Sequence, residues 1–306
     1  VSKILFIIEL NKLRMDTNEL KMPQLRLFEE PVVHKAPNVA SVPQYSPLRY
    51  PGGKTWFYPF AKRWLLHFRK QVLIEPFAGG GSVGLAAAIE GMVDHVVMVE
   101  KDPDVAAFWK TIVGSNAEWL CERIVNFELI PDRIDEALEK KEHSQRDRAF
   151  ALVLCNRINH GGILANGSGR IANGENGKGI RSRWYPATLK KRIKLISQAQ
   201  KRIEIIEGDG LEFMREFQND PNALFFIDPP YTKAGKRLYT HFEVDHQRVF
   251  QRADACAGEV MLTYDYADEI MDYANIYGFL TDKILMKTTH HLKKYELMIS
   301  KNFSWL

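Results

Sequence analysis

The chain has 306 residues, of which 45% are hydrophobic and 26% are charged, a composition typical of globular proteins. The formal net charge of +4 permits a polyanionic partner without requiring one. The three cysteines lack metal-site spacing and are odd in number, so we expect no disulfide framework and a reducing, cytoplasmic location. No apolar run approaches the roughly 20 residues that span a bilayer, so we expect no membrane association.

The first segment, residues 1–45, contains scattered prolines and no long apolar pattern. We expect it to be an N-terminal arm or a disordered tail, and we assign no chemistry to it.

A glycine turn follows, between Tyr50 and Lys54, and a helical pattern starts at Trp56. Free N–H groups at the start of a helix favour an anion or a carboxylate, and Lys54 adds a positive charge. Tyr50 could stack on a ring. The spacing is not that of a Walker loop, and a plain turn is the alternative.

The next unit is a short apolar strand at residues 72–75 and a glycine loop that contains Phe77, Gly79 and Gly81. A strand, a glycine loop and a helix in this order predict the first βα turn of a Rossmann-like sheet. Roughly twenty residues later a second strand ends at Glu100, where an acid can hold ribose hydroxyls. The pattern predicts an adenosine-containing ligand. NAD, ATP and S-adenosylmethionine all fit, although the glycine spacing disfavours NAD.

Residues 105–155 are predicted to be mostly helical, and from Asn156 onward the chain becomes rich in glycine, asparagine and basic residues. A long loop with basic and aromatic side chains suits a nucleic-acid backbone and extruded bases. The alternative is a solvated loop beside a charged helix face. The candidate nucleic-acid contacts are Asn156, Arg157, Asn159, Arg170, Arg181, Arg183 and Trp184.

The apolar run 223–227 predicts a buried parallel strand that ends in Asp228, Pro229, Pro230 and Tyr231. Two consecutive prolines cannot continue a ladder, so Asp228 lies at the carboxyl end of the strand, where open α/β sheets bind ligands. The Asp228 carboxylate and a proline carbonyl can both accept hydrogen bonds from one planar amino group, and Tyr231 offers a ring for stacking. A proline turn with a capping aspartate is the alternative.

Other segments complete the prediction. A strand at residues 203–207 precedes Asp209, which could contact an adenine ring or cap a helix. Lys233 and Lys236 lie in a basic segment that we expect to close over a polyanion. Residues 284–291 and 295–300 predict a closing hairpin. His290 and His291 have no partner ligands at useful spacing, so we predict no metal site.

Together these motifs resemble the Dam-type family of DNA adenine methyltransferases, the alpha group of amino-methylating enzymes. The resemblance covers about residues 47–300. It rests on the turn from Tyr50 to Lys54, the loop from Phe77 to Gly84, Glu100, Asn156 and Arg157 with Gly161 and Gly162, and the loop from Asp228 to Tyr231. It implies an α/β fold, with a Rossmann-like S-adenosylmethionine-dependent methyltransferase sheet and a mostly helical target-recognition insertion.

The resemblance also implies roles for residues. Asp228 is the catalytic acid and lies near the cofactor, Glu100 holds the ribose of S-adenosylmethionine, and Tyr50 and Lys54 contact the cofactor. We expect the cofactor site to include Phe77, Gly79, Gly81 and Asp209 as well, and the catalytic loop to include Pro229, Pro230 and Tyr231. The insertion lacks the Arg-Tyr-Asn pattern of the family, so we assign no GATC target.

The domain boundaries follow from the same resemblance. We expect residues 46–115 and 200–306 to form the catalytic methyltransferase domain and residues 116–199 to form the target-recognition insertion. A cognate restriction endonuclease could accompany the chain in a restriction-modification pair.

We therefore predict a site-specific DNA adenine methyltransferase that acts on the N6 amine of an adenine flipped out of double-stranded DNA. RNA adenine methylation remains an alternative. So do cytosine amino-methylation, where a serine commonly replaces the first acid of the loop, and protein glutamine methylation, where an asparagine stands there. A non-catalytic DNA-binding module with a remnant cofactor pocket is disfavoured by the intact Asp228 and glycine loop.

Overall fold

The computed structural model describes residues 31–306, apart from residues 166, 175–176, 232–242 and 288–292. Residues 32–306 form one compact unit. Within the described residues, none of the helices combines the length and the hydrophobicity that crossing a bilayer requires.

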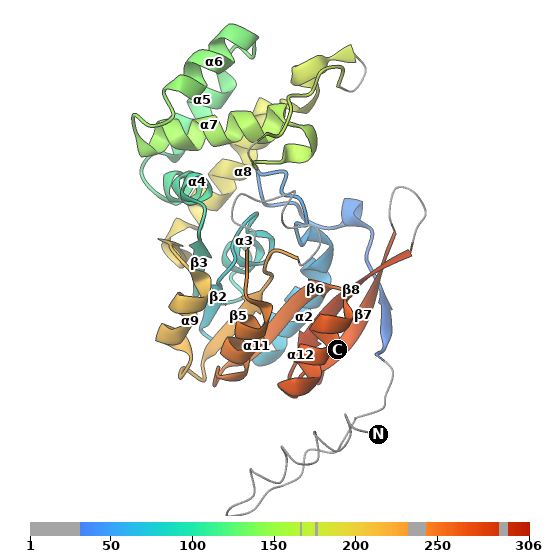
Figure 1. The fold of residues 1–306 in the computed structure, drawn as a ribbon. Helices are drawn as coiled ribbons and strands as arrows, with labels where there is room; N and C mark the ends of the chain where they lie inside the picture. Colours follow the sequence, from blue (N-terminus) through green and yellow to red (C-terminus); the bar gives the residue numbers. More distant parts are fainter. Residues whose placement is uncertain (1–30, 166, 175–176, 232–242, 288–292) are drawn as a thin grey trace, which may run out of the picture. The chain divides into compact units, whose positions relative to one another are not determined.

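An eight-stranded mixed sheet runs through the described part of the chain (Figure 1). Its spatial order is β1-β7-β8-β6-β5-β2-β3-β4, and neighbours are parallel except that β8 is antiparallel to both β6 and β7. The strands are β1 (Val33–Lys35), β2 (Val72–Glu75), β3 (His95–Glu100), β4 (Ile203–Glu207), β5 (Ala223–Ile227), β6 (Glu259–Asp265), β7 (Leu280–Lys287) and β8 (Lys293–Ser300).

The order of strands places a topological switch point between β2 and β5. From β2 the chain winds outward through β3 and β4, and from β5 it winds in the opposite direction through β6. Ligands of open α/β sheets bind outside the carboxyl ends of the strands at such a point. The predicted Rossmann-like α/β sheet is confirmed.

Helices cover both faces of the sheet (Figure 1). They are α2 (Tyr58–Phe68), α3 (Ser82–Ile89), α4 (Pro103–Val113), α5 (Ala117–Val125), α6 (Pro131–Glu139), α7 (Gln145–Ile158), α8 (Pro186–Gln198), α9 (Gly210–Phe217), α11 (His246–Asp254) and α12 (Asp268–Ile276). Short 3-10 helices are η1 (Val39–Ser41), η2 (Thr55–Phe57), η3 (His160–Gly162), η5 (Gly179–Arg183) and η6 (Gln200–Arg202).

The central strand β5 explains how two cores form. Its five residues are all buried, which is why it reads as one continuous apolar run. Side chains alternate across a strand, so Leu224 and Phe226 pack with α2, α3 and α4, whereas Phe225 and Ile227 pack with α9, α11 and α12. Pro229 and Pro230 end the strand as predicted.

The helices α5 to α8 continue the first of these cores beyond the sheet. Helix α7 packs on α4, and α8 packs on α3, α4 and α5. Ser144 caps the start of α7, because its hydroxyl accepts a hydrogen bond from the Asp147 N–H. The predicted helical character of residues 116–199 is thus observed in its described part, and its helices rest on those that cover the sheet.

The edge of the sheet differs from the prediction. Residues 33–35 were expected to belong to an arm or a disordered tail; they form the strand β1, which pairs with β7. His34 Nε2 lies 2.9 Å from Asp282 Oδ2 and the Val32 N–H donates to Asp282 Oδ1 at 3.2 Å, so one aspartate on β7 holds this short strand.

Candidate active site

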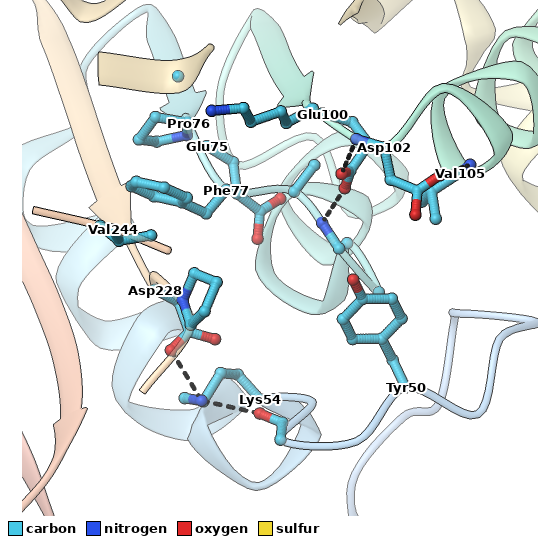
Figure 2. A pocket seen from close by; sticks show the side chains of 18 of the residues that line it. Tyr50, Lys54, Glu75, Pro76, Phe77, Glu100, Asp102, Val105, Asp228 and Val244 are labelled. Atoms are coloured by element: carbon cyan, nitrogen blue, oxygen red, sulfur yellow. Dashed lines mark hydrogen bonds and ion pairs between the residues drawn. The ribbon is translucent and has the colours of Figure 1, made fainter. Parts of the chain in front are cut away.

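A cavity of about 290 Å³ lies at the carboxyl ends of the central strands. Its walls come from residues 50–54, 75–82, 100–102, 209–211, 228 and 230, and 243–245. The cavity therefore combines the two glycine segments, the strand ends of β2 and β3, and the catalytic loop that the sequence predicted separately. Figure 2 shows Lys54, Glu75, Phe77, Glu100 and Asp228 arranged around it.

The glycine loop after β2 is shaped by the ring of Tyr50. A Cβ atom at Gly79 would lie 2.7 Å from Tyr50 Cε1, and one at Gly80 would lie 2.8 Å from Tyr50 Cβ. Gly79 and Gly81 also have positive φ values of 46° and 64°, which disfavour side chains. The loop can thus lie directly against Tyr50 only because it consists of glycine, and this brings together two segments that were each expected to bind the cofactor.

Glu100 ends β3 and holds the glycine loop. Its Oε2 accepts a hydrogen bond from the Gly79 N–H at 2.8 Å, and its Oε1 accepts one from the Asp102 N–H at 2.9 Å. Burial raises the pKa of Glu100 to about 7. The hydrogen bond from the Asp102 N–H opposes this rise, and the charge of Asp102 adds to it. Each carboxylate oxygen can accept a second hydrogen bond, so Glu100 can also bind ribose hydroxyls, and that contact stays a prediction.

Glu75, at the end of β2, is a site residue that our sequence analysis missed. It is buried, lines the cavity, and accepts a hydrogen bond from the Gly84 N–H at 3.1 Å. Burial raises its pKa to about 8; the Gly84 N–H opposes this rise and the Asp228 charge adds to it. An apolar strand that ends in an acid and a proline occurs here just as at Asp228, and this repeated pattern was the available signal.

Asp228 meets Lys54 at one end of the cavity (Figure 2). Lys54 Nζ lies 2.8 Å from Asp228 Oδ1 and donates to the Gly52 carbonyl at 2.7 Å. The Thr263 hydroxyl donates to the same Oδ1 at 2.8 Å. Burial raises the pKa of Asp228, and Lys54 and Thr263 oppose that rise. Lys54 was predicted to contact the cofactor; it does line the cavity, but its ammonium points at the predicted catalytic acid.

Tyr231 is held beside this pair. Its hydroxyl donates to Glu296 Oε2 at 2.8 Å, and its ring stacks against Tyr264 with centroids 6.2 Å apart. Lys54 Nζ lies 4.7 Å from the centroid of the Tyr231 ring. Pro230 lines the cavity, whereas Pro229 is buried and is not part of the cavity wall. Glu296 and Thr263 come from β8 and β6, and no local sequence signal marks them.

Other residues add apolar surface to the cavity. Phe77 and Val244 line it, and both pack against the core that includes α9, α11 and α12. Asp209 caps α9 by accepting from the Leu211 N–H at 3.0 Å, and it also accepts from Lys101 Nζ at 3.0 Å. Partial burial acts to raise the pKa of Asp209, but the hydrogen bond and charge of Lys101 outweigh it and lower the pKa. The capping alternative for Asp209 is thus observed, and the adenine contact stays a prediction.

Three predicted nucleic-acid contacts lie inside the protein. Asn156, Arg157 and Asn159 are between 0% and 8% exposed. Asn156 bonds to the backbone of Arg49, the Arg157 guanidinium donates to the Pro47 carbonyl, and Asn159 donates to the Ile163 carbonyl at 3.0 Å. These side chains therefore use hydrogen-bonding groups within the protein, and their contact with nucleic acid stays a prediction.

The remaining predicted contacts are more accessible. Arg170 is exposed and its Nη2 lies 2.5 Å from Asp135 Oδ1, and exposed Arg181 donates to the Leu129 carbonyl at 3.3 Å. Arg183 and Trp184 are half-buried, and Trp184 lies 6.2 Å from the ring of Phe127. Lys233, Lys236, His290 and His291 lie outside the described residues.

The sequence model of the D12 class N6 adenine-specific DNA methyltransferase family matches residues 50–277. No curated protein matches the chain. Similar solved structures include a precorrin-6y C5,15-methyltransferase from Geobacter metallireducens GS-15, with 9% identity, 79% of this chain and 85% of that chain covered, and a TM-score of 0.36. Another is an uncharacterized protein from Listeria monocytogenes serotype 4b, with 8% identity, coverage of 81% and 67%, and a TM-score of 0.36.

Proposed function

Because the chain belongs to the D12 class of N6 adenine-specific DNA methyltransferases, we propose that it transfers a methyl group from S-adenosylmethionine to the N6 amine of an adenine rotated out of duplex DNA. The observation that carries the proposal is the position of Asp228. Its carboxylate and the glycine loop line the same cavity at the switch point of the sheet. An amine held by Asp228 would therefore lie next to a cofactor held by the loop.

The residues of the cavity fit S-adenosylmethionine. Phe77 and Val244 offer apolar surface for an adenine ring, and Glu100 lies at the strand end where an acid can hold ribose hydroxyls. Asp228 provides negative charge, and Glu75 provides a carboxyl group that a nearby cation favours in its ionised form, which suits the sulfonium and ammonium groups of the ligand. When bound, S-adenosylmethionine supplies a methyl group that its positively charged sulfur has already activated.

The protein's own part in the reaction is to position the amine. Lys54 and Thr263 both contact Asp228 Oδ1, which leaves Oδ2 to accept a hydrogen bond from the N6 amine. The Pro229 carbonyl accepts the second N–H of the amine, and the Tyr231 ring stacks on the base. Orientation and a fixed polar field then supply most of the rate, so no strong general base is needed.

We propose the division of labour that the resemblance implied. Residues 46–115 and 200–306 carry catalysis, and residues 116–199 recognise the target. Arg170, Arg181, Arg183 and Trp184, together with Lys233 and Lys236, contact the duplex, while Asn156, Arg157 and Asn159 support the loops around them. A duplex DNA substrate and cysteines without disulfides favour the cytoplasm, and a cognate restriction endonuclease would explain a site-specific activity.

The proposal is tested by incubating the full chain with tritiated S-adenosylmethionine and, separately, duplex DNA, RNA and protein. Label in the DNA that elutes as N6-methyldeoxyadenosine after digestion to nucleosides is the expected result. Label in RNA, in cytosine or in protein would show that this acceptor, and not DNA adenine, is the substrate. The absence of label from every acceptor would indicate a binding module. Sequencing modified bases in a host that expresses the chain would then identify the recognition site.

A further inference from the structure

Glu296 lies beside the catalytic loop although it is far from that loop in sequence. It belongs to β8 and follows the segment matched by the family model, which ends at residue 277. Only 7% of the residue is exposed. Its Oε2 accepts the Tyr231 hydroxyl at 2.8 Å and lies 3.9 Å from Lys54 Nζ. One carboxylate oxygen thus meets two groups of the proposed active site.

Lys54 is shared between two carboxylates. Its ammonium lies 2.8 Å from Asp228 and 3.9 Å from Glu296, and the residue is 3% exposed. A buried ammonium this close to Asp228 reduces the negative charge that Asp228 can offer to an amine. The second carboxylate offsets part of that reduction, so the three groups together carry a net negative charge, which suits an amine that donates hydrogen bonds.

The surroundings of Glu296 add few other charges. Lys294 on the same strand lies 3.9 Å from Glu296 Oε1 and is 47% exposed, so solvent weakens its effect. Asp265 on β6 is the cross-strand neighbour, and the neighbour on β7 is the apolar Ile284. Burial raises the pKa of Asp228, Lys54 and Thr263 oppose that rise, and the charge of Glu296 adds to it. Glu296 therefore acts on Asp228 directly through the electrostatic effect of its charge, as well as indirectly through Lys54.

The geometry points to Glu296 as a positioning residue of the methyl-transfer site, which fixes the Tyr231 ring through its hydroxyl and offsets part of the Lys54 charge beside Asp228. This inference rests on the proposed function, because the group that Asp228 must receive is the adenine amine. A carboxylate that only stabilised the fold would affect unfolding and leave the ionisation of Asp228 unchanged.

Glu296→Gln separates these roles. The amide oxygen can still accept from Tyr231, but the negative charge is lost and Lys54 pairs with Asp228 alone. We expect kcat on duplex DNA to fall about tenfold, because Asp228 becomes a weaker hydrogen-bond acceptor when its pKa falls by roughly one unit. The acidic limb of the kcat profile should move to lower pH, because Asp228 loses a neighbouring negative charge. Binding of S-adenosylmethionine should stay within about twofold of the wild type, since Glu296 does not line its cavity.

Two further variants serve as controls. Tyr231→Phe removes the hydrogen bond and keeps the charge, so kcat should fall without movement of the acidic limb. Glu259→Gln changes a carboxylate on β6 that lies outside the cavity and should match the wild type. A Glu296→Gln enzyme with wild-type kcat and an unshifted profile, or with only a changed melting temperature, overturns the inference alone. A wild-type chain that methylates no DNA adenine overturns the proposed function and this inference together.

Discussion

Asn156 and Arg49 are joined by two hydrogen bonds of 2.9 Å, one from the Arg49 N–H to Asn156 Oδ1 and one from Asn156 Nδ2 to the Arg49 carbonyl. The same Nδ2 donates to the Gly162 carbonyl at 3.0 Å. A fully buried amide side chain near the end of α7 thus bonds both the N–H and the carbonyl of one residue, as a neighbouring strand would. It fixes the backbone of Arg49, which precedes Tyr50. This pair therefore joins α7 to the segment that leads to Tyr50 in the wall of the cavity.

Asn156→Ala tests that connection. The substitution removes the three hydrogen bonds that the Asn156 side chain makes to the backbone of Arg49 and Gly162, so we expect the free energy of unfolding to fall by on the order of 1–3 kcal/mol. Binding of S-adenosylmethionine should weaken because Tyr50 shifts. Urea unfolding and calorimetric titration measure the two effects. Asn126→Ala, at the exposed end of α5, is the matched control, and equal stability of the two variants would contradict the prediction.

Asp228→Asn removes the charge of the proposed catalytic acid and keeps its size. We expect methyl transfer to fall by on the order of 10²–10³-fold, comparable to the loss of one transition-state hydrogen bond, with an unchanged circular dichroism spectrum. Asp228→Ala should also abolish transfer and retain the fold, at a lower melting temperature because Lys54 keeps only Glu296 as a carboxylate neighbour. Exposed Asp272→Asn on α12 is the control. Turnover near the wild-type level in Asp228→Asn would refute the assignment.

Glu75 couples cofactor binding to pH. Its pKa of about 8 means that the cofactor-free protein holds a proton there at neutral pH. A cationic ligand favours the ionised carboxylate, so binding of S-adenosylmethionine should release protons, and affinity should rise as pH increases towards about 8. Calorimetry in two buffers with different ionisation enthalpies measures this release. Glu75→Gln should abolish most of it, whereas Glu207→Gln on the surface should not; equal release in the wild type and Glu75→Gln would contradict the prediction.

The stability of the cofactor-free protein should depend on the same group and on Glu100. Both carboxyls have pKa values raised above the ordinary 4.5, to about 8 and about 7. Their contribution is fully present below pH 4.5 and is lost as pH rises through the folded values, because the unfolded chain releases protons that the folded protein retains. The melting temperature should therefore fall between pH 5 and pH 8. A Glu75→Gln variant with an equally steep fall would exclude Glu75 as its source.

Arg170 and Arg181 are the exposed arginines of the insertion that we propose to contact phosphates. Each substitution by alanine should weaken binding to all DNA sequences alike and reduce the slope of log affinity against log salt by about 0.9. Fluorescence anisotropy at several salt concentrations measures the slope. Arg215→Ala on α9 is the matched control, and an unchanged slope in the Arg170 and Arg181 variants would remove them from the interface.

Local sequence patterns were sufficient to predict those elements that depend on residues close together in the chain. The strand of residues 223–227 was predictable because a strand buried on both faces must be continuously apolar, and two prolines must end it. Helix α3 begins at Ser82, three positions before the alanine-rich pattern, because Gly81 ends the loop in a left-handed conformation and leaves the next residues free to be helical. Strand β1 was missed because its partner β7 is about 250 residues away and its own three residues carry no distinctive pattern.

The sequence by itself determined the acids at the strand ends, since a parallel strand that stops at Glu100 or Asp228 must present that acid at the ligand-binding edge of the sheet. Only the tertiary structure decided what surrounds them. Lys54 arrives from the glycine turn, Thr263 from β6 and Glu296 from β8, and these segments meet because the antiparallel strand β8 inserts between β6 and β7. Strand order depends on contacts between distant segments, and periodicity within one segment does not contain that information.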